Sequence, residues 1–486
     1  MKKIIFSIAT LAALTVSCVN ESDDYNLDRD LPYSVPAGSL LTNAQKELAD
    51  QMTTPSVNLN VFRYFSQYWA ATQYTTETRY RIKTRNIPDN HWNNLYRDVL
   101  GNLETAKLAV NNEVKPSDVS TADWNIQQKN KLAIIEIQEL YTYQILVDTF
   151  GDIPYTDALN PSIVLPKYDN DATIYPKLIT RLNAALANLD DSGISFEQGD
   201  YIYNGDVHAW KLFANSLKVK LGINLADVDP ALAKTTVETA YADGVIMTDA
   251  DNAKFNYVVA APNYNPIYAN LVASGRNDFV PASTIVNAMN TLNDPRRAKY
   301  FTLFNGIYKG ANYGYANAYI NFSHISDNIK QPDAAGILFE STEMKFYLAE
   351  AAERGYNVGN TGEYYYNEAI RNSFTSWGLS TADADAYLLN PSVAYTTAAG
   401  TYKEKIGYQA WIAYFNRGFE SWTTWRRLDA PVITAPASAL PEAEGVVPKR
   451  YTYPVNEQTV NGANWQAASA AMGGDKLKNK VFWDVN

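Results

Sequence analysis

Apolar positions recur with a helical period along most of this chain, and the strongest signal lies in residues 129–159. The other faces of this segment are also largely apolar, so a helix here exposes little surface to water and other helices have to pack around it. Gly151 suits the position just past a helix end, and Pro154 disfavours helical backbone at the residue before it. The main apolar stripe of the expected helix consists of Ile134, Ile137, Leu140, Tyr141 and Ile145.

Other segments with helical periodicity follow one another in pairs. The first pair consists of residues 95–110 and the central helix, at about the spacing of a tetratricopeptide repeat. Three more pairs are expected in residues 174–221, 341–378 and 403–431. The spacing between pairs is too irregular for a regular solenoid. The pattern therefore predicts a mainly α fold, in which about four tetratricopeptide-like helix pairs form a scaffold interrupted by insertions.

Two further helical signals lie outside these pairs. Residues 39–52 and 59–69 each carry an apolar stripe, and we expect them to form an antiparallel pair of helices. The dipeptide Asp229-Pro230 predicts the start of another helix, because aspartate caps a first turn and proline fits its first position.

The apolar stripe is lost in residues 67–82, where aromatic side chains gather beside an arginine. Aromatic rings with a guanidinium group suit a ligand site. For any single aromatic residue, the alternative is a position in the protein core. The candidate ligand contacts from this segment are Trp69, Tyr74, Arg79 and Tyr80.

A long irregular insertion is expected at about residues 251–332, where helical periodicity fades except in residues 281–292. The insertion is rich in Tyr, Asn and Gly, and loops of this length in a compact domain are usually functional. Asparagine amides pair with hydroxyl groups and tyrosine rings stack on sugar faces, so the composition suits a carbohydrate ligand. The alternative is a structural cap over the helices. The candidate contacts here are Tyr264, Tyr268, Asn277, Tyr313 and Tyr315.

The N-terminus has the pattern of a bacterial secretory signal. Lys2 and Lys3 precede an apolar run, and Ser17 stands before Cys18, the only cysteine. We therefore expect a signal peptide in residues 1–17 and lipidation of Cys18, rather than release as a soluble periplasmic protein. Residues 18–38 then form a lipid-anchored tether, because the sequence after the cysteine is polar and acidic.

Composition and charge limit the classes of partner. Hydrophobic residues make up 46% and charged residues 19% of the chain, as in an ordinary globular protein. The formal net charge of -11 argues against nucleic acid as a partner. Tyrosine is abundant, with 35 residues against 17 Phe and 10 Trp, and its flat ring with a hydroxyl group suits polar ligands that have apolar patches.

The sequence contains no recognisable catalytic or metal-binding motif. Its three histidines, His91, His208 and His324, are scattered without metal-ligand spacing, so no metal site is predicted. A glycosidase pair of carboxylates, brought together only by folding, would leave no motif, and an enzyme is therefore the minor hypothesis. No cofactor is predicted, and the sequence leaves open a structural calcium ion in the acidic loops.

Several blocks of the chain resemble the SusD/RagB family of nutrient-binding lipoproteins from Bacteroidetes outer membranes. GDIPYTDAL follows the central helix, and LTVSC at the N-terminus resembles a lipobox. The C-terminal third carries the strongest resemblance, and its blocks stand in the family's order. They are EMKFYLAEAAERG, FESWTTWRRLDAP, KRYTYPVNEQTVNGANWQAA and GGDKLKNKVFWD.

The resemblance implies a single SusD-like helical domain in residues 39–486 and a lipoprotein of the outer membrane facing the cell exterior. The acidic residues Glu21, Asp23 and Asp24 resemble the family's signal for export to the outer leaflet. The implied function is capture of an oligosaccharide, without catalysis, and its transfer to a SusC-like TonB-dependent transporter. The alternatives within the family are capture of a peptide, or a structural transporter lid without ligand specificity of its own.

Overall fold

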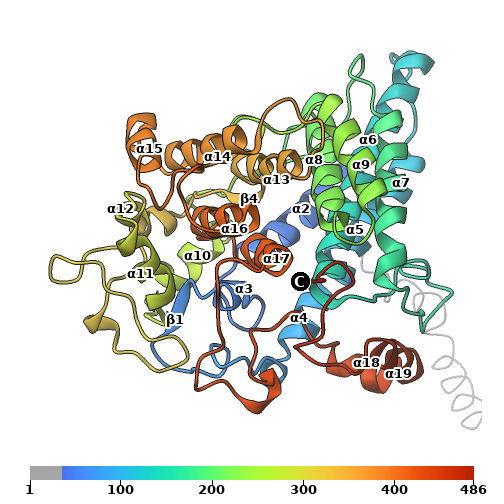
Figure 1. Cartoon of the computed structure of the whole chain (residues 1–486). Helices are drawn as coiled ribbons and strands as arrows, with labels where there is room; N and C mark the ends of the chain where they lie inside the picture. The colour runs from blue at the N-terminus through green and yellow to red at the C-terminus, as the bar shows by residue number, and fades with distance from the viewer. Residues whose placement is uncertain (1–34) are drawn as a thin grey trace, which may run out of the picture. The chain divides into compact units, whose positions relative to one another are not determined.

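The computed structural model describes residues 35–486, and residues 37–486 form one compact unit. The predicted signal peptide, Cys18 and most of the predicted tether lie outside the described residues. The fold of the compact unit is mainly helical, as the periodicity predicts (Figure 1).

The first half of the unit is a group of helices that pack on their neighbours in sequence. In Figure 1 most of them lie side by side, with α6 among them. Their bounds are α2 (Ala37–Thr53), α5 (Gly101–Asn111), α6 (Thr121–Phe150), α7 (Asp171–Asn188), α8 (Val207–Leu225) and α9 (Pro230–Ala242). Asp229 caps α9 through the N–H of Leu232, with Pro230 at its first position, as expected.

The central helix α6 is confirmed as a buried helix. Its N-terminus is capped by Ser120, which accepts a hydrogen bond from the N–H of Asp123. Every residue from 137 to 150 is buried, and α5, α7 and α8 pack against the helix. Gly151 ends it with a φ of 80°, a conformation that glycine adopts without strain.

The second half of the unit adds another set of helices, in which α13 packs on α14 and α16 packs on α17. These contacts join the segments expected to pair in residues 341–378 and 403–431. The bounds are α13 (Ser341–Glu353), α14 (Gly362–Ser376), α15 (Thr381–Leu388), α16 (Tyr402–Ala413), α17 (Gly418–Leu428), α18 (Val455–Val460) and α19 (Gly462–Ala471).

The expectation of a helix over residues 59–69 is wrong. Only the short α3 (Phe62–Phe65) is helical, because Gln67 takes a positive φ of 51° and the chain then enters strand β1 (Trp69–Ala71). The helix α2 packs on α5 instead. The apolar stripe of residues 59–69 reflects burial on all sides, because a fully buried short strand cannot be told from a helix by periodicity alone.

The insertion of residues 251–332 is largely irregular, and two short antiparallel sheets attach it to the helices. In one sheet, β1 pairs with β3 (Phe279–Pro281), and Trp69 stands opposite Pro281. In the other, β2 (Ala253–Phe255) pairs with β4 (Gly336–Phe339). The insertion also contains the short helices α10 (Pro266–Tyr268), α11 (Ser283–Thr291) and α12 (Arg297–Tyr300).

A buried ionic network joins three helices at the centre of the unit. Lys220 of α8 has a fully buried side chain whose Nζ lies 3.3 Å from Glu343 Oε1 of α13 and 3.0 Å from Glu420 Oε1 of α17. Arg417 lies at the start of α17 and binds Glu343 Oε2 at 2.6 Å and Glu340 Oε1 at 2.9 Å. Burial alone would lower the pKa of Lys220, but the two glutamates raise it above its usual value.

Replacement of Lys220 by methionine should destabilise the protein strongly. The variant leaves Glu343 and Glu420 buried beside Arg417 alone, and breaking a buried ion pair in this way costs about 3–5 kcal/mol. Chemical denaturation of the variant should therefore show a much lower midpoint. Lys234→Met is the matched control, because Lys234 lies on α9 with a side chain that is 52% exposed. The denaturation midpoint of this control variant should equal that of the natural protein. Equal midpoints for Lys220→Met and the natural protein would contradict the importance of the network.

A pair of buried carboxylates connects the turn after α6 to the start of α7. Asp152 Oδ1 accepts a hydrogen bond of 2.8 Å from the N–H of Asp171, and Asp171 Oδ2 accepts one of 2.9 Å from the N–H of Phe482. Burial raises the pKa of Asp171 to about 7, and the neighbouring Asp152 adds to the rise. The pKa of Asp152 is also raised, again mainly by burial.

This pair predicts a pH dependence of stability. An aspartate in an unfolded chain has a pKa of about 4, so between pH 4 and 7 the folded protein binds more protons at Asp171 than the unfolded chain does. The free energy of unfolding should therefore fall as pH rises through this window. Asp171→Asn mimics the protonated carboxyl group, and its melting temperature should fall less between pH 5 and 8 than that of the natural protein. The control is Asp157→Asn in the same turn, and a profile of Asp171→Asn that matches the natural protein would refute the assignment.

Candidate functional site

A pocket of about 190 Å³ opens beside the β1–β3 sheet, and we call it the Tyr74 pocket. Its residues come from two segments that are about 200 positions apart in sequence and that the pairing of β1 with β3 brings together. Its lining residues are Val57, Tyr64, Gln73, Tyr74, Arg85, Arg276, Asp278 and Phe279.

The floor of the Tyr74 pocket is apolar and rigid. Tyr64 and Phe279 are both buried, with ring centroids 6.1 Å apart, and the ring of Trp69 packs against Phe279 at 5.3 Å. The backbone N–H of Thr72 donates to the carbonyl of Asp278 at 2.9 Å, which holds the two rim segments together. A preformed floor of this kind reduces the ordering that a ligand must impose.

Tyr74 is the feature of the rim that is most accessible to a ligand. Its side chain is 62% exposed, more than any other tyrosine among the described residues. Its backbone has a φ of 55°, which costs a bulky residue about 1–3 kcal/mol and is tolerated only where the surrounding structure enforces it. The buried Tyr80 has a φ of 65°, so this conformation alone does not mark a ligand site. At Tyr74 it accompanies a ring that is exposed beside the pocket.

Charged side chains complete the rim in two ion pairs. Arg276 Nε donates to Asp278 Oδ2 at 2.6 Å, and Arg85 Nε contacts the carboxylate of Glu77. Glu77 has a buried side chain, and burial raises its pKa despite the contact with Arg85. The pocket therefore combines an apolar floor, an exposed ring and several polar groups, as small-molecule sites do.

Three of the candidate residues named from the sequence are buried supports. The guanidinium carbon of Arg63 lies over the ring of Trp69, 5.0 Å from the centroid of that ring. Tyr80 accepts a hydrogen bond of 3.1 Å from Gln67 Nε2. The hydroxyl of Tyr313 donates to the carbonyl of Tyr64 at 2.7 Å. Trp69 and Tyr80 thus lie in the core, the alternative given for their segment. Tyr313, from the insertion, packs against Tyr64 and Tyr80 as the structural alternative for that segment expects.

The other candidates lie at or beyond the rim. Arg79 Nε donates to the carbonyl of Ser438 at 2.7 Å, which ties it to the segment after α17. Asn277 is exposed between two lining residues. Tyr264 and Tyr268 form an edge-to-face pair 5.2 Å apart, outside the pocket lining, and Tyr315 is 49% exposed.

Sequence reasoning missed most of the residues that line the pocket. Gln73, Arg85, Arg276 and Asp278 belong to it, while Tyr74 is the only named candidate in its lining. The one available signal was a charged pair, Arg276 and Asp278, within a loop rich in Tyr, Asn and Gly. The contact between residues 69–71 and 279–281 was not detectable, because three-residue strands leave too short a pattern.

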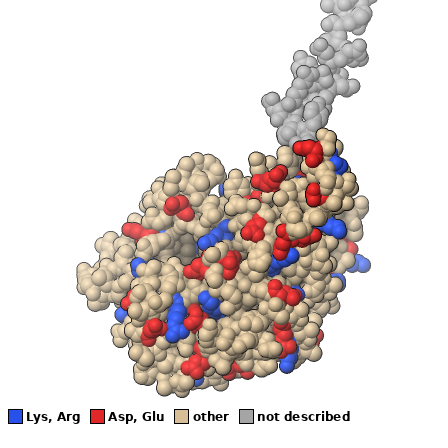
Figure 2. Space-filling model, turned by 90° about the horizontal axis from the view of Figure 1, so that it is seen from above, with Lys and Arg blue, Asp and Glu red and all other residues tan. Residues whose placement is uncertain are grey.

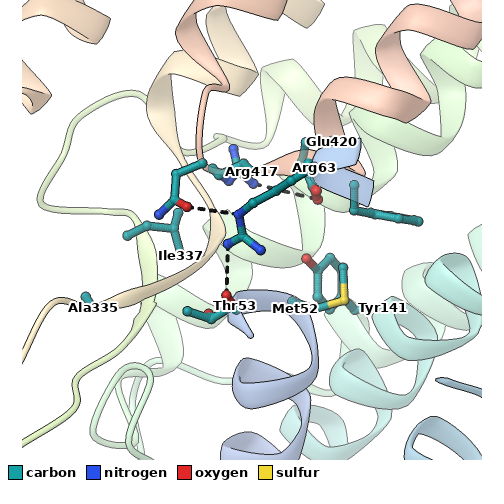
Figure 3. Close-up of a pocket in the computed structure, with 11 residues that line it drawn as sticks. Met52, Thr53, Arg63, Tyr141, Ala335, Ile337, Arg417 and Glu420 are labelled. Carbon is teal, nitrogen blue, oxygen red and sulfur yellow. Dashed lines mark hydrogen bonds and ion pairs between the residues drawn. The ribbon is translucent and has the colours of Figure 1, made fainter. Parts of the chain in front are cut away.

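A second, smaller cavity lies between α2, α17 and β4, and Figure 3 shows its lining. Arg63 donates from Nη2 to the carbonyl of Thr53 at 2.8 Å and from Nε to Asn416 Oδ1 at 3.0 Å. Burial lowers the pKa of Arg63 to about 9. The volume of about 40 Å³ holds no more than a few water molecules, so this cavity is part of the polar interior and too small for a sugar.

Two larger hollows lie elsewhere on the surface. One of about 510 Å³ is bounded by α14 and α16 and includes the rings of Tyr366 and Tyr408. The other, of about 590 Å³, lies near the start of α6 and includes Trp124 and Lys131. Tyr366, Tyr408 and Trp124 are buried or half-buried, whereas Tyr74 is exposed. The Tyr74 pocket therefore presents the most accessible aromatic ring for stacking on a ligand.

Two absences among the described residues concern metal ligands and membrane-spanning helices. Within residues 35–486, no three His, Cys, Asp or Glu side chains are grouped so as to hold a metal ion. None of the helices in this part of the chain is long and apolar enough to cross a membrane. On the face in Figure 2, acidic and basic side chains are interspersed without a broad patch of one sign.

Comparison with known proteins gives a family match over most of the chain. Residues 29–454 match the SusD-like family described as starch-binding and associating with the outer membrane. No curated protein matches the chain. Many solved structures are similar to this chain, and three of them are similar over nearly their whole length. They support both the resemblance seen in the sequence and the mainly helical fold.

The first of these structures is a chitin-binding protein with 26% identity and a TM-score of 0.79, and the match covers 93% of this chain and 100% of that one. A SusD homologue from Bacteroides uniformis has 27% identity and a TM-score of 0.77, covering 92% and 99%. A chitin-binding SusD homologue from Flavobacterium johnsoniae has 25% identity and a TM-score of 0.75, covering 93% and 98%. Because the family match extends over well more than half of the sequence, this chain belongs to the SusD-like family of non-catalytic binding proteins associated with the outer membrane.

Proposed function

We propose that this protein captures an oligosaccharide at the Tyr74 pocket and passes it to a SusC-like TonB-dependent transporter. The observation that carries the proposal is the exposed ring of Tyr74 beside polar groups and above an apolar floor. Sugars present C–H faces that pack on aromatic rings and hydroxyl groups that need donors and acceptors. Two of the similar structures are described as chitin-binding, which agrees with a glycan as ligand.

The proposed setting is the outer face of the outer membrane. A signal peptide in residues 1–17 and lipidation of Cys18 would anchor the chain through a tether in residues 18–38. Residues 39–486 would form a single SusD-like domain on tetratricopeptide-like helix pairs, with the insertion of residues 251–332 forming part of the binding face. The anchor keeps the site near the transporter, which raises the effective concentration of captured ligand there.

Ligand binding without catalysis is enough for this role. The glycan would stack on Tyr74 and exchange hydrogen bonds with Gln73, Asn277 and the two arginines of the rim. The pocket holds about one sugar unit, while the rest of the oligosaccharide would lie on the open surface. Since the captured ligand has to be released to the transporter, only modest affinity and fast dissociation are needed.

Peptide capture is less well supported by the geometry. A peptide that adds a strand to a sheet needs a free edge of several residues. The strands β1 and β3 have three residues each, and all six are buried. A lid without its own ligand specificity would not require the exposed ring of Tyr74 beside a polar pocket.

Replacement of Tyr74 by alanine should weaken glycan binding by about tenfold, since a lost stacking face is worth about 1.4 kcal/mol. Calorimetry against a panel of plant, microbial and host oligosaccharides measures the effect. Tyr364→Ala on α14 is the matched control, because this tyrosine is 46% exposed and lies outside the pocket. The melting temperatures of both variants should equal that of the natural protein.

The same panel, extended to peptides and with analysis of the products, separates the alternatives. Heat from peptides alone would favour peptide capture, and cleaved glycan would overturn the non-catalytic role. Binding that is unaffected by Tyr74→Ala would remove the Tyr74 pocket as the site. No binding heat with any oligosaccharide or peptide would favour a lid that acts only together with its transporter.

A further inference from the structure

The two arginines that line the Tyr74 pocket are more exposed than the carboxylates that pair with them, of which Asp278 also lines the pocket. Arg276 is 56% exposed and Arg85 is 35% exposed. Their acidic partners are far less accessible, at 14% for Asp278 and 1% for Glu77. A ligand that enters the pocket therefore meets the two guanidinium groups before it meets the carboxylates.

Each arginine also keeps hydrogen-bond donors for a ligand. Arg276 uses Nε and Nη2 on Asp278, and Arg85 uses Nε on Glu77 and Nη1 in a long contact of 3.4 Å with Asn58 Oδ1. Among the described residues, Arg276 Nη1 and Arg85 Nη2 donate to no protein atom. A guanidinium group has no acceptor, so these free edges suit an anion better than a neutral hydroxyl group.

The acidic partners orient the two arginines and leave part of each guanidinium group accessible to a ligand. Asp278 lies two residues from Arg276 and fixes its orientation through the 2.6 Å hydrogen bond. Glu77 is the buried partner of Arg85 and leaves that arginine the more exposed member of the pair. Arg296 and Arg427 are buried in their ion pairs, whereas the two arginines at the pocket are partly exposed.

We propose that the ligand of the Tyr74 pocket is an acidic glycan, whose uronic or sialic acid carboxylate binds between Arg85 and Arg276 while a sugar face packs on Tyr74. This inference rests on the proposed function and names the class of its ligand. Planar carboxylates match the donor geometry of guanidinium groups, and such charge-assisted hydrogen bonds are roughly twice as strong as neutral ones. The volume of about 190 Å³ suits one acidic sugar unit with the remaining units outside.

The test compares ligands that differ only in charge. Calorimetry on the full chain uses oligogalacturonate, oligoalginate and a sialylated oligosaccharide, together with methyl-esterified oligogalacturonate as the neutral match. At least one acidic glycan should bind about tenfold or more tightly than a neutral one of similar length. Its affinity should fall as sodium chloride rises from 50 to about 500 mM, because salt screens charge at an exposed site.

Variants of the two arginines assign the effect to the pocket. Arg276→Ala and Arg85→Gln should each weaken acidic-glycan binding about tenfold, while Arg276→Lys should retain part of the affinity. Arg276→Ala should leave the melting temperature unchanged, whereas Arg85→Gln should lower it because Glu77 is left buried without its partner. Arg371→Ala is the matched control, since Arg371 lies on α14, is also 35% exposed and is also paired with carboxylates. It should bind as the natural protein does.

Three outcomes would overturn the inference. Equal affinity for oligogalacturonate and its methyl ester, with tight binding that depends on Tyr74, would leave glycan capture standing and remove the acidic class. Arginine-dependent binding of a sulfated glycan without carboxylates, with no binding of uronic or sialic acids, would refute the carboxylate. Absence of binding to any glycan, neutral or acidic, would contradict the proposed function itself.

Discussion

The fold depends on keeping a fully buried lysine charged at the centre of the compact unit. Lys220 is stable there only while Glu343 and Glu420 face it, since an unpaired charge in such surroundings is costly. This requirement holds α8, α13 and α17 in register, and Arg417 extends the network to Glu340 at the end of β4. The first and second halves of the chain are thereby joined into one rigid support.

The candidate site is built where this support meets the irregular insertion. Pairing of β1 with β3 brings Tyr74 and Arg85 next to Arg276 and Asp278, and buried rings beneath them fill the space to the core. The site therefore has a rigid floor and an exposed rim, a division that suits a protein that captures a ligand and releases it again.

Much of the scaffold could be predicted from the sequence, because long amphipathic or fully apolar helices leave a clear period. The helix α6, its stop at Gly151 and the start of α9 at Pro230 all follow from local signals. The segment 59–69 could not be predicted in the same way, since its apolar positions serve a short helix and a three-residue strand. For the site, exposure decides which aromatic residue can meet a ligand, and sequence does not reveal that Tyr74 is exposed while Trp69 and Tyr80 are buried.

The central claim is that a glycan binds in the Tyr74 pocket. Hydrogen-exchange mass spectrometry of the chain, with and without a saturating concentration of its tightest-binding oligosaccharide, tests this claim most directly. If the glycan binds there, exchange should slow in residues 72–85 and 276–281, with little change elsewhere. Protection confined to the surroundings of Trp124 or Tyr408, with these two segments unchanged, would contradict it.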